Sequence, residues 1–210
     1  AGERNPKMAV ITISRQFGAG GITLGQRLAK KLGYDFIYEE IIEKVAEKAA
    51  VSKDWVNSLV KDGGGSLSNF MAGFVPSKLM DHIFNTQRQY MDEKAYIKLL
   101  YQIVPQIAQR DNLVIVGRGG QFILKDYPDT HHVLLIADLA YRIDFMKRRY
   151  QLSEEAARKA VTKEDLRRRK LLRLFNAVDY NRPEHYDLVL NMSKINMDLA
   201  EALVCDLLVP

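Results

Sequence analysis

A run of small and polar residues, SRQFGAGG, interrupts the chain at residues 14–21, directly after its first apolar stretch. Glycines allow the backbone N–H groups of such a loop to turn toward an anion, and the positive N-terminus of a following helix attracts the same anion. These residue types in this place therefore predict a loop that binds phosphate groups. The residues expected to contact the phosphates of a bound ligand are Ser14, Arg15, Phe17, Gly18, Ala19, Gly20, Gly21, Ile22 and Thr23.

The loop departs from the common phosphate-loop pattern G-x-x-x-x-G-K-[ST], in which a lysine reaches the β- and γ-phosphates. When residues 18–20 are aligned with the end of that pattern, Arg15 stands at its first glycine and Gly21 at its lysine. Three interpretations stay open: a phosphate loop with another cation, for which Arg15 is the candidate; a loop that binds nucleotide without catalysis; and a tight structural turn. In the first, Thr23 would offer its hydroxyl to Mg²⁺ or phosphate.

A second concentration of functional groups lies at residues 142–173, which hold twelve basic residues against five acids. This segment carries a charge of +7, whereas the whole chain carries +5. Such a field indicates an anionic partner, although a solvated, charged helix has the same composition. Within the segment, Asp165 precedes Arg168 and Arg169 by three and four residues, so the three side chains are expected on one helical face.

Five short apolar runs predict the strands that would position these groups. The runs at residues 112–116 and 131–137 are too apolar for an exposed sheet, and helical patterns such as residues 23–33 separate the runs along the chain. Parallel neighbours need a crossover connection, so this alternation predicts an α/β fold with a doubly wound parallel sheet of about five strands. The predicted strands cover residues 8–13, 35–38, 112–116, 131–137 and 186–191.

Ligands of such sheets bind outside the carboxyl ends of the strands, where the loops after neighbouring strands meet. Two of these loops are rich in glycine, namely residues 14–21 and the GRGG sequence at residues 117–120. We therefore expect the two loops to face the same ligand. Arg118, in the second loop, carries a fixed charge and forked donors that suit a phosphate group.

With ITISRQFGAGGITLGQRLAKKLG, GRGGQFIL and a late basic helix in this order, the chain resembles the cytidylate kinase-like family, a divergent branch of the P-loop nucleoside monophosphate kinases. The resemblance spans nearly the whole chain. It implies one P-loop NTPase-type domain over residues 1–210, with a helical acceptor-binding insertion at about 50–105 and a basic helical lid at about 150–180. It also implies transfer of a phosphoryl group from ATP, with Mg²⁺ carried by the nucleotide, to a nucleoside monophosphate or another small phosphorylated acceptor.

The resemblance assigns roles to particular residues. Arg118 matches the arginine that grips the acceptor's phosphate, and Lys44 stands in place of an arginine of the acceptor-binding part. Gly119 replaces an aspartate that helps the family to recognise cytosine, so specificity for CMP is not expected. A lid folds basic residues over the phosphate in transfer, and the residues expected to take part with Arg15 in catalysis are Asp165, Arg168, Arg169 and Arg173.

Composition and hydropathy exclude several other classes of protein. No apolar run approaches the ~20 residues of a membrane helix, and residues 1–7 lack the apolar core of a signal peptide. We therefore expect a cytoplasmic protein without a membrane partner. The single Cys205 and the scattered histidines predict neither an internal disulfide nor a metal site built by the protein itself.

Two alternatives to the kinase interpretation stay open. A nucleotide-binding sensor or interaction protein that retains the kinase fold without catalysis would also explain the absent lysine. An RNA-binding protein would need aromatic residues among its basic ones, and residues 142–173 offer only Phe145 and Tyr150, so no nucleic-acid partner is expected. The apolar positions of residues 77–109 would fit either packing on their own chain or a homodimer interface.

Overall fold

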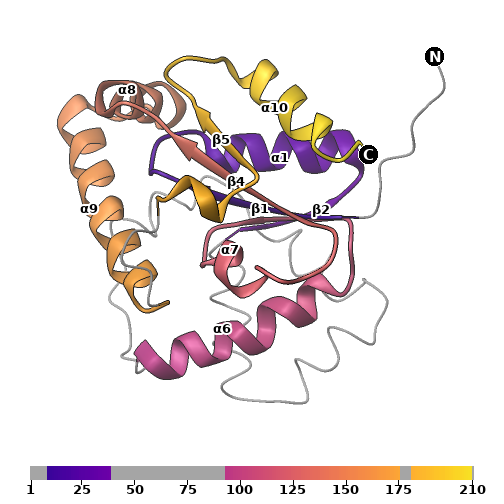
Figure 1. Ribbon diagram of the computed structural model, residues 1–210. Helices are drawn as coiled ribbons and strands as arrows, with labels where there is room; N and C mark the ends of the chain where they lie inside the picture. Colours follow the sequence, from indigo (N-terminus) through magenta and orange to yellow (C-terminus); the bar gives the residue numbers. More distant parts are fainter. Residues whose placement is uncertain (1–8, 39–92, 176–180, 210) are drawn as a thin grey trace, which may run out of the picture.

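The computed structural model describes residues 9–38, 93–175 and 181–209, in which a five-stranded parallel β-sheet has helices on both faces (Figure 1). The strand order is β2-β3-β1-β4-β5, and every neighbouring pair runs parallel. This arrangement confirms the predicted doubly wound sheet. The strands are β1 (Val10–Arg15), β2 (Asp35–Tyr38), β3 (Leu113–Val116), β4 (Thr130–Ile136) and β5 (Leu188–Asn191).

Helices α1 and α10 cover one face of the sheet, and α6 and α7 cover the other (Figure 1). The central strands are therefore buried from both sides, which is why β3 is a continuous apolar run rather than an alternating one. The described helices are α1 (Gly21–Leu32), α6 (Glu93–Ala108), α7 (Gly120–Ile123), α8 (Leu139–Tyr150), α9 (Glu154–Arg173), the 3-10 helix η1 (Pro183–His185) and α10 (Met197–Asp206). None of them is long and apolar enough to cross a membrane.

The first strand and first helix come closer together than the sequence predicts. Strand β1 continues two residues beyond the predicted end at Ile13, because Ser14 and Arg15 still pair with β4 in spite of their polarity. Helix α1 begins at Gly21 rather than Thr23 and ends, as predicted, at a left-handed Gly33 with φ of 70°. The connection is thus only residues 16–20, and Arg15 is held by the sheet.

The basic segment forms two helices, α8 and α9, instead of one long helical stretch. The chain breaks at Gln151, which has a φ of 54°, and restarts at Ser153, whose Oγ accepts the N–H of Ala156 at 3.2 Å. The two helices pack on each other through a small apolar cluster of Ile143, Met146, Ala157 and Val161. Together they form the α8–α9 hairpin, which stands beside the sheet (Figure 1).

The predicted insertion at about 50–105 is described only from residue 93, where α6 begins. Leu100, Ile103 and Val104 of this helix are buried in the main core. Its packing on α7 places it next to the loop after β3. Residues 39–92, which include Lys44, lie outside the described residues.

Candidate active site

The loop between β1 and α1 depends on glycines for its shape. Gly18 and Gly20 have φ values of 84° and 87°, a region that side chains rarely adopt. A Cβ added at Gly18 would also lie 2.8 Å from the carbonyl oxygen of Arg142, so the loop passes directly against α8. Gly20 is the N-cap of α1 and brings no side chain to its first turn, which leaves that end of the helix positive.

The side chain of Arg15 lies against Gly21, the residue that aligns with the lysine of an ordinary phosphate loop. A Cβ added at Gly21 would lie 2.9 Å from Cγ of Arg15 and 3.2 Å from its Cβ and Cδ. Atoms of this kind almost never approach so closely, so the aliphatic stem of Arg15 lies across Gly21 and leaves no room for a side chain there. The arginine at one end of the loop and the glycine at the other are sterically linked.

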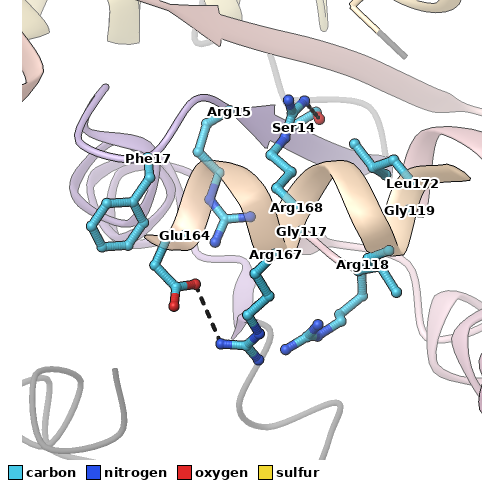
Figure 2. A pocket seen from close by; sticks show the side chains of 11 residues that line it. Ser14, Arg15, Phe17, Gly117, Arg118, Gly119, Glu164, Arg167, Arg168 and Leu172 are labelled. Atoms are coloured by element: carbon cyan, nitrogen blue, oxygen red, sulfur yellow. Dashed lines mark hydrogen bonds and ion pairs between the residues drawn. The ribbon is translucent and has the colours of Figure 1, made fainter. Parts of the chain in front are cut away.

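An open cavity, which we call the arginine cavity, lies between the loops after β1 and β3 and helix α9 (Figure 2). Among the described residues that line it are four arginines and one acid, Glu164, an excess of three positive charges. Such an excess favours a ligand with several negative charges. The lining residues are Ser14, Arg15, Phe17, Gly117, Arg118, Gly119, Glu164, Arg167, Arg168, Leu171 and Leu172.

A second open cavity, the loop cavity, lies between the glycine loop, the first turn of α1 and helix α8. Arg15 and Phe17 line both cavities and therefore mark their junction. Of the nine loop residues expected at the phosphates, only the buried Ala19 lines neither cavity. The loop cavity is lined by Arg15, Phe17, Gly18, Gly20, Gly21, Ile22, Thr23, Phe145, Met146 and Tyr150.

Arg118 enters the arginine cavity from a tight turn after β3. Gly117, Arg118 and Gly119 have φ values of 91°, 55° and 73°, so three consecutive residues are left-handed. For a non-glycine residue this conformation costs about 1–2 kcal/mol, and Arg118 is only 4% exposed. A strained, buried arginine that lines a cavity is typical of a functional group.

Gly119 leaves no space for the aspartate that the family resemblance places there. A Cβ added to it would lie 2.5 Å from the ring of Phe175. Phe175 in turn stacks on Phe122 at 5.7 Å between ring centroids. The position beside Arg118 is therefore occupied by aromatic rings, whereas the family resemblance places there the carboxylate that helps to recognise cytosine.

The arginines of α9 divide between the cavity and the solvent. Arg167 and Arg168 line the cavity, whereas Arg169 and Arg173 are exposed and line neither cavity. In Figure 2 the side chains of Arg167 and Arg118 point toward each other from opposite walls. Arg167 forms an ion pair with Glu164 at 3.3 Å.

Arg168 lies at the opposite end of the cavity, next to Ser14 (Figure 2). Its Nη2 donates to Ser14 Oγ at 3.0 Å, and its Nη1 donates to Asn181 Oδ1 at 3.1 Å. Tyr186, which sequence reasoning missed, contacts the same group. Burial raises the pKa of its phenol above the ordinary value of 10.0, although hydrogen bonds with Ser14, Gln121 and Arg168 act in the opposite direction. The hydroxyl therefore stays protonated at neutral pH.

Asp165 does not hold Arg168 and Arg169, contrary to the interpretation drawn from their spacing. Its Oδ2 accepts from Arg142 Nη1 at 2.6 Å, and its Oδ1 accepts from the backbone N–H of Phe17 at 3.3 Å. Sequence spacing predicts contacts within one helix only. The packing of α8 on α9 brings Arg142 of α8 to Asp165, which the spacing does not indicate.

The ion pair of Arg167 with Glu164 was not predicted from the sequence. Three adjacent arginines of a helix point in different directions, and spacing alone does not indicate which one faces the acid. The pattern of α9 contains a signal that would have found Glu164 and Arg168. The buried residues of α9 form one helical stripe, and Arg168 continues it at the same spacing; they are Ala157, Ala160, Val161, Glu164 and Leu172. A charged residue within an apolar stripe is either paired or functional.

The sheet order, with a glycine loop between its central strand and the first helix, defines a P-loop kinase fold. A model of the cytidylate kinase-like family matches residues 10–194, so the chain belongs to this family. This finding confirms the resemblance noted in the sequence.

Two solved structures support the same fold. The chain is similar to an uncharacterized protein from Eubacterium ventriosum ATCC 27560, with 17% identity, a TM-score of 0.67, and 95% of this chain and 98% of that chain covered. It is also similar to shikimate kinase from Bacteroides thetaiotaomicron, with 14% identity, a TM-score of 0.50, and 96% and 98% covered. Among curated proteins, none matches the sequence.

Proposed function

We propose that the protein is an ATP-dependent phosphotransferase that acts on a nucleoside monophosphate or another small phosphorylated acceptor. The observation that carries this proposal is the position of Arg15. Its stem replaces the side chain absent at Gly21, and it lies where the loop cavity and the arginine cavity meet. A cation at the junction of a donor site and an acceptor site is where phosphoryl transfer requires one.

On the donor side, the phosphates of ATP would lie over the glycine loop at the N-terminus of α1. Thr23 lines the loop cavity and would offer its hydroxyl to the Mg²⁺ that accompanies the nucleotide. When bound, this ion neutralises charge on the phosphate oxygens. Within the described residues, no cluster of three or more His, Cys, Asp or Glu residues could hold a metal.

On the acceptor side, Arg118 and the α9 arginines would hold the acceptor's phosphate. Transfer between two polyanions brings like charges together, and the three excess positive charges of the arginine cavity would offset that repulsion. Arg15 would stabilise the charge that develops on the equatorial oxygens of the phosphoryl group in transfer. Of the three lid arginines predicted to take part in catalysis, we keep only Arg168 in the arginine cavity, because Arg169 and Arg173 face the solvent.

A nucleotide-binding sensor without catalysis is the second candidate, and Gly21 favours it because no lysine stands at that position. Both candidates predict that ATP stabilises the protein. Only the kinase predicts ADP formation that depends on an acceptor.

The test is ADP release from Mg-ATP over a panel of nucleoside monophosphates and other small phosphorylated acceptors. Acceptor-dependent turnover that is lost in Arg15→Ala and in Arg118→Ala supports the kinase. Arg148→Ala is the matched control, since Arg148 is 69% exposed on α8 and lines neither cavity. No turnover with any acceptor, while ATP still raises the melting temperature, supports the sensor instead.

A further inference from the structure

Phe17 ties the glycine loop to both helices of the α8–α9 hairpin. Its ring packs against the apolar cluster between the two helices, which includes Met146 and Val161. Its backbone N–H donates to Asp165 of α9, and its carbonyl oxygen accepts from Arg142 of α8 at 3.2 Å. One loop residue is therefore held by a side chain from each helix. We call Phe17, Arg142 and Asp165 the loop latch.

Arg142 is the centre of this latch. It is only 7% exposed, and one nitrogen, Nη1, donates both to Asp165 and to the carbonyl of Phe17. Its backbone lies so close to Gly18 that a Cβ there would be 2.8 Å from the Arg142 oxygen. Only the arginine of this ion pair is buried, because the Asp165 side chain is 28% exposed. A partly buried ion pair adds little stability, so its presence here calls for a positional reason.

That reason is the place of Asp165 on α9, within one turn of three residues that line the arginine cavity. Asp165 is flanked on the same helix by Glu164, Arg167 and Arg168, which all line the arginine cavity. Because a helix is stiff over one turn, fixing Asp165 to Phe17 also fixes these side chains relative to the loop. Neither Arg142 nor Asp165 is among the residues that line the two cavities.

We propose that Arg142 and Asp165 are positioning residues that couple the glycine loop to the α9 arginines, so that anion binding at the loop orders the arginine cavity. This inference rests on the proposed function for its kinetic part. Asp165 thereby acts through Phe17 and Arg142 and does not touch the phosphate. The α8–α9 hairpin and the loop respond to a ligand as one unit.

The kinetic test compares Asp165→Asn and Arg142→Lys with the parent. Asn keeps the size of the side chain but lacks its charge, and Lys keeps the charge but lacks the forked donors. We expect kcat to fall about 100-fold while KM for ATP changes little, since small misplacements of catalytic groups have effects of this size. Asp144→Asn is the control, because it removes an exposed ion pair of 2.7 Å with Arg148 on the same hairpin. An unchanged kcat in both latch variants, or an equal loss in the control, would overturn the proposal.

A second measurement needs no turnover. Hydrogen exchange of the full chain is followed with and without inorganic tripolyphosphate, for the loop and for residues 164–172 of α9. In the parent, we expect protection of both segments; in Asp165→Asn, we expect protection of the loop alone. Protection confined to the loop in the parent would refute the coupling and leave the kinase proposal intact. Protection of neither segment would refute both.

Discussion

A double variant that moves the proposed phosphate-binding cation from position 15 to position 21 should keep the activity that we propose. Arg15→Ala removes the cation, and Gly21→Lys restores one from the other end of the loop. Gly21 is not in the left-handed region, so its backbone accepts a side chain, and only the Arg15 stem at 2.9 Å stands in the way. The double variant Arg15→Ala/Gly21→Lys removes Cγ and Cδ of that stem and keeps only its Cβ, at 3.2 Å from the new Cβ, so we expect it to fold after a small shift.

The expected magnitudes follow from these contacts. Removing one preorganised donor at a transition state lowers kcat by about 10²–10³, which corresponds to about 2.7–4 kcal/mol. Arg15→Ala should show a loss of this size. Gly21→Lys alone should lose at least about tenfold, because the new side chain displaces the Arg15 guanidinium. The double variant should recover to within about tenfold of the parent.

The assay is kcat by coupled ADP detection, together with tripolyphosphate affinity by calorimetry and a melting curve for each variant. Arg15→Ala/Gly21→Met is the matched control, since methionine fills the same space without a charge. Equal recovery in the Lys and Met double variants would refute the reasoning, because packing rather than charge would then be the cause. A Lys double variant as inactive as Arg15→Ala would refute it as well.

Three further predictions concern stability. Gly119→Ala should lower the melting temperature more than Gly33→Ala, because both glycines are left-handed but only Gly119 faces the Phe175 ring at 2.5 Å, whereas nothing lies within 4 Å of Gly33; equal losses would contradict the packing argument. Burial lowers the pKa of His132 below its ordinary value of 6.5, so the unfolded chain takes up this proton at a higher pH than the folded one, and stability should fall as pH drops below about 6.5. Urea unfolding from about pH 7.5 to 5 measures this, and a His132→Gln variant with the same slope would rule it out. Sulfate, pyrophosphate and tripolyphosphate should raise the melting temperature in that order at constant ionic strength, because each added charge meets another arginine of the arginine cavity. A ligand at 100 times its Kd stabilises the folded protein by about 2.7 kcal/mol. Equal shifts for all three anions would count against a multivalent anion site.

The strands could be predicted because buried parallel strands are continuous apolar runs. The predicted bounds of the strands and helices are wrong mainly at their ends, where polar residues such as Ser14 and Arg15 continue a strand. Hydropathy ends β1 at Ile13, yet backbone hydrogen bonding continues to Arg15, whose register partner is Leu135. The pattern of side chains along the sequence indicates burial, whereas a strand is defined by its backbone hydrogen bonds. The two differ at the end of β1, beside the site that we propose.

The site was predicted as a list of residues but not as a set of contacts. The sequence indicates that a lysine is absent at Gly21, but only the three-dimensional structure places the Arg15 stem over it. Likewise, Asp165 and Arg142 are 23 residues apart and meet only because α8 and α9 fold back on each other. Local spacing rules describe one helix, and this site depends on contacts between elements.

The absence of a lysine at Gly21 and the presence of the loop latch fit one arrangement of the loop. In an ordinary phosphate loop the cation rises from the first turn of the helix, so the helix sets its position. Here Arg15 is the last residue of β1, and its pairing with Leu135 makes the sheet set that position. The loop then has no lysine of its own at the helix, and the contacts of Phe17 with Arg142 and Asp165 fix it from the hairpin instead. The phosphate-binding element that we propose is thus divided between sheet and hairpin. A chain that had merely lost its lysine would have no physical reason to pack an arginine across Gly21.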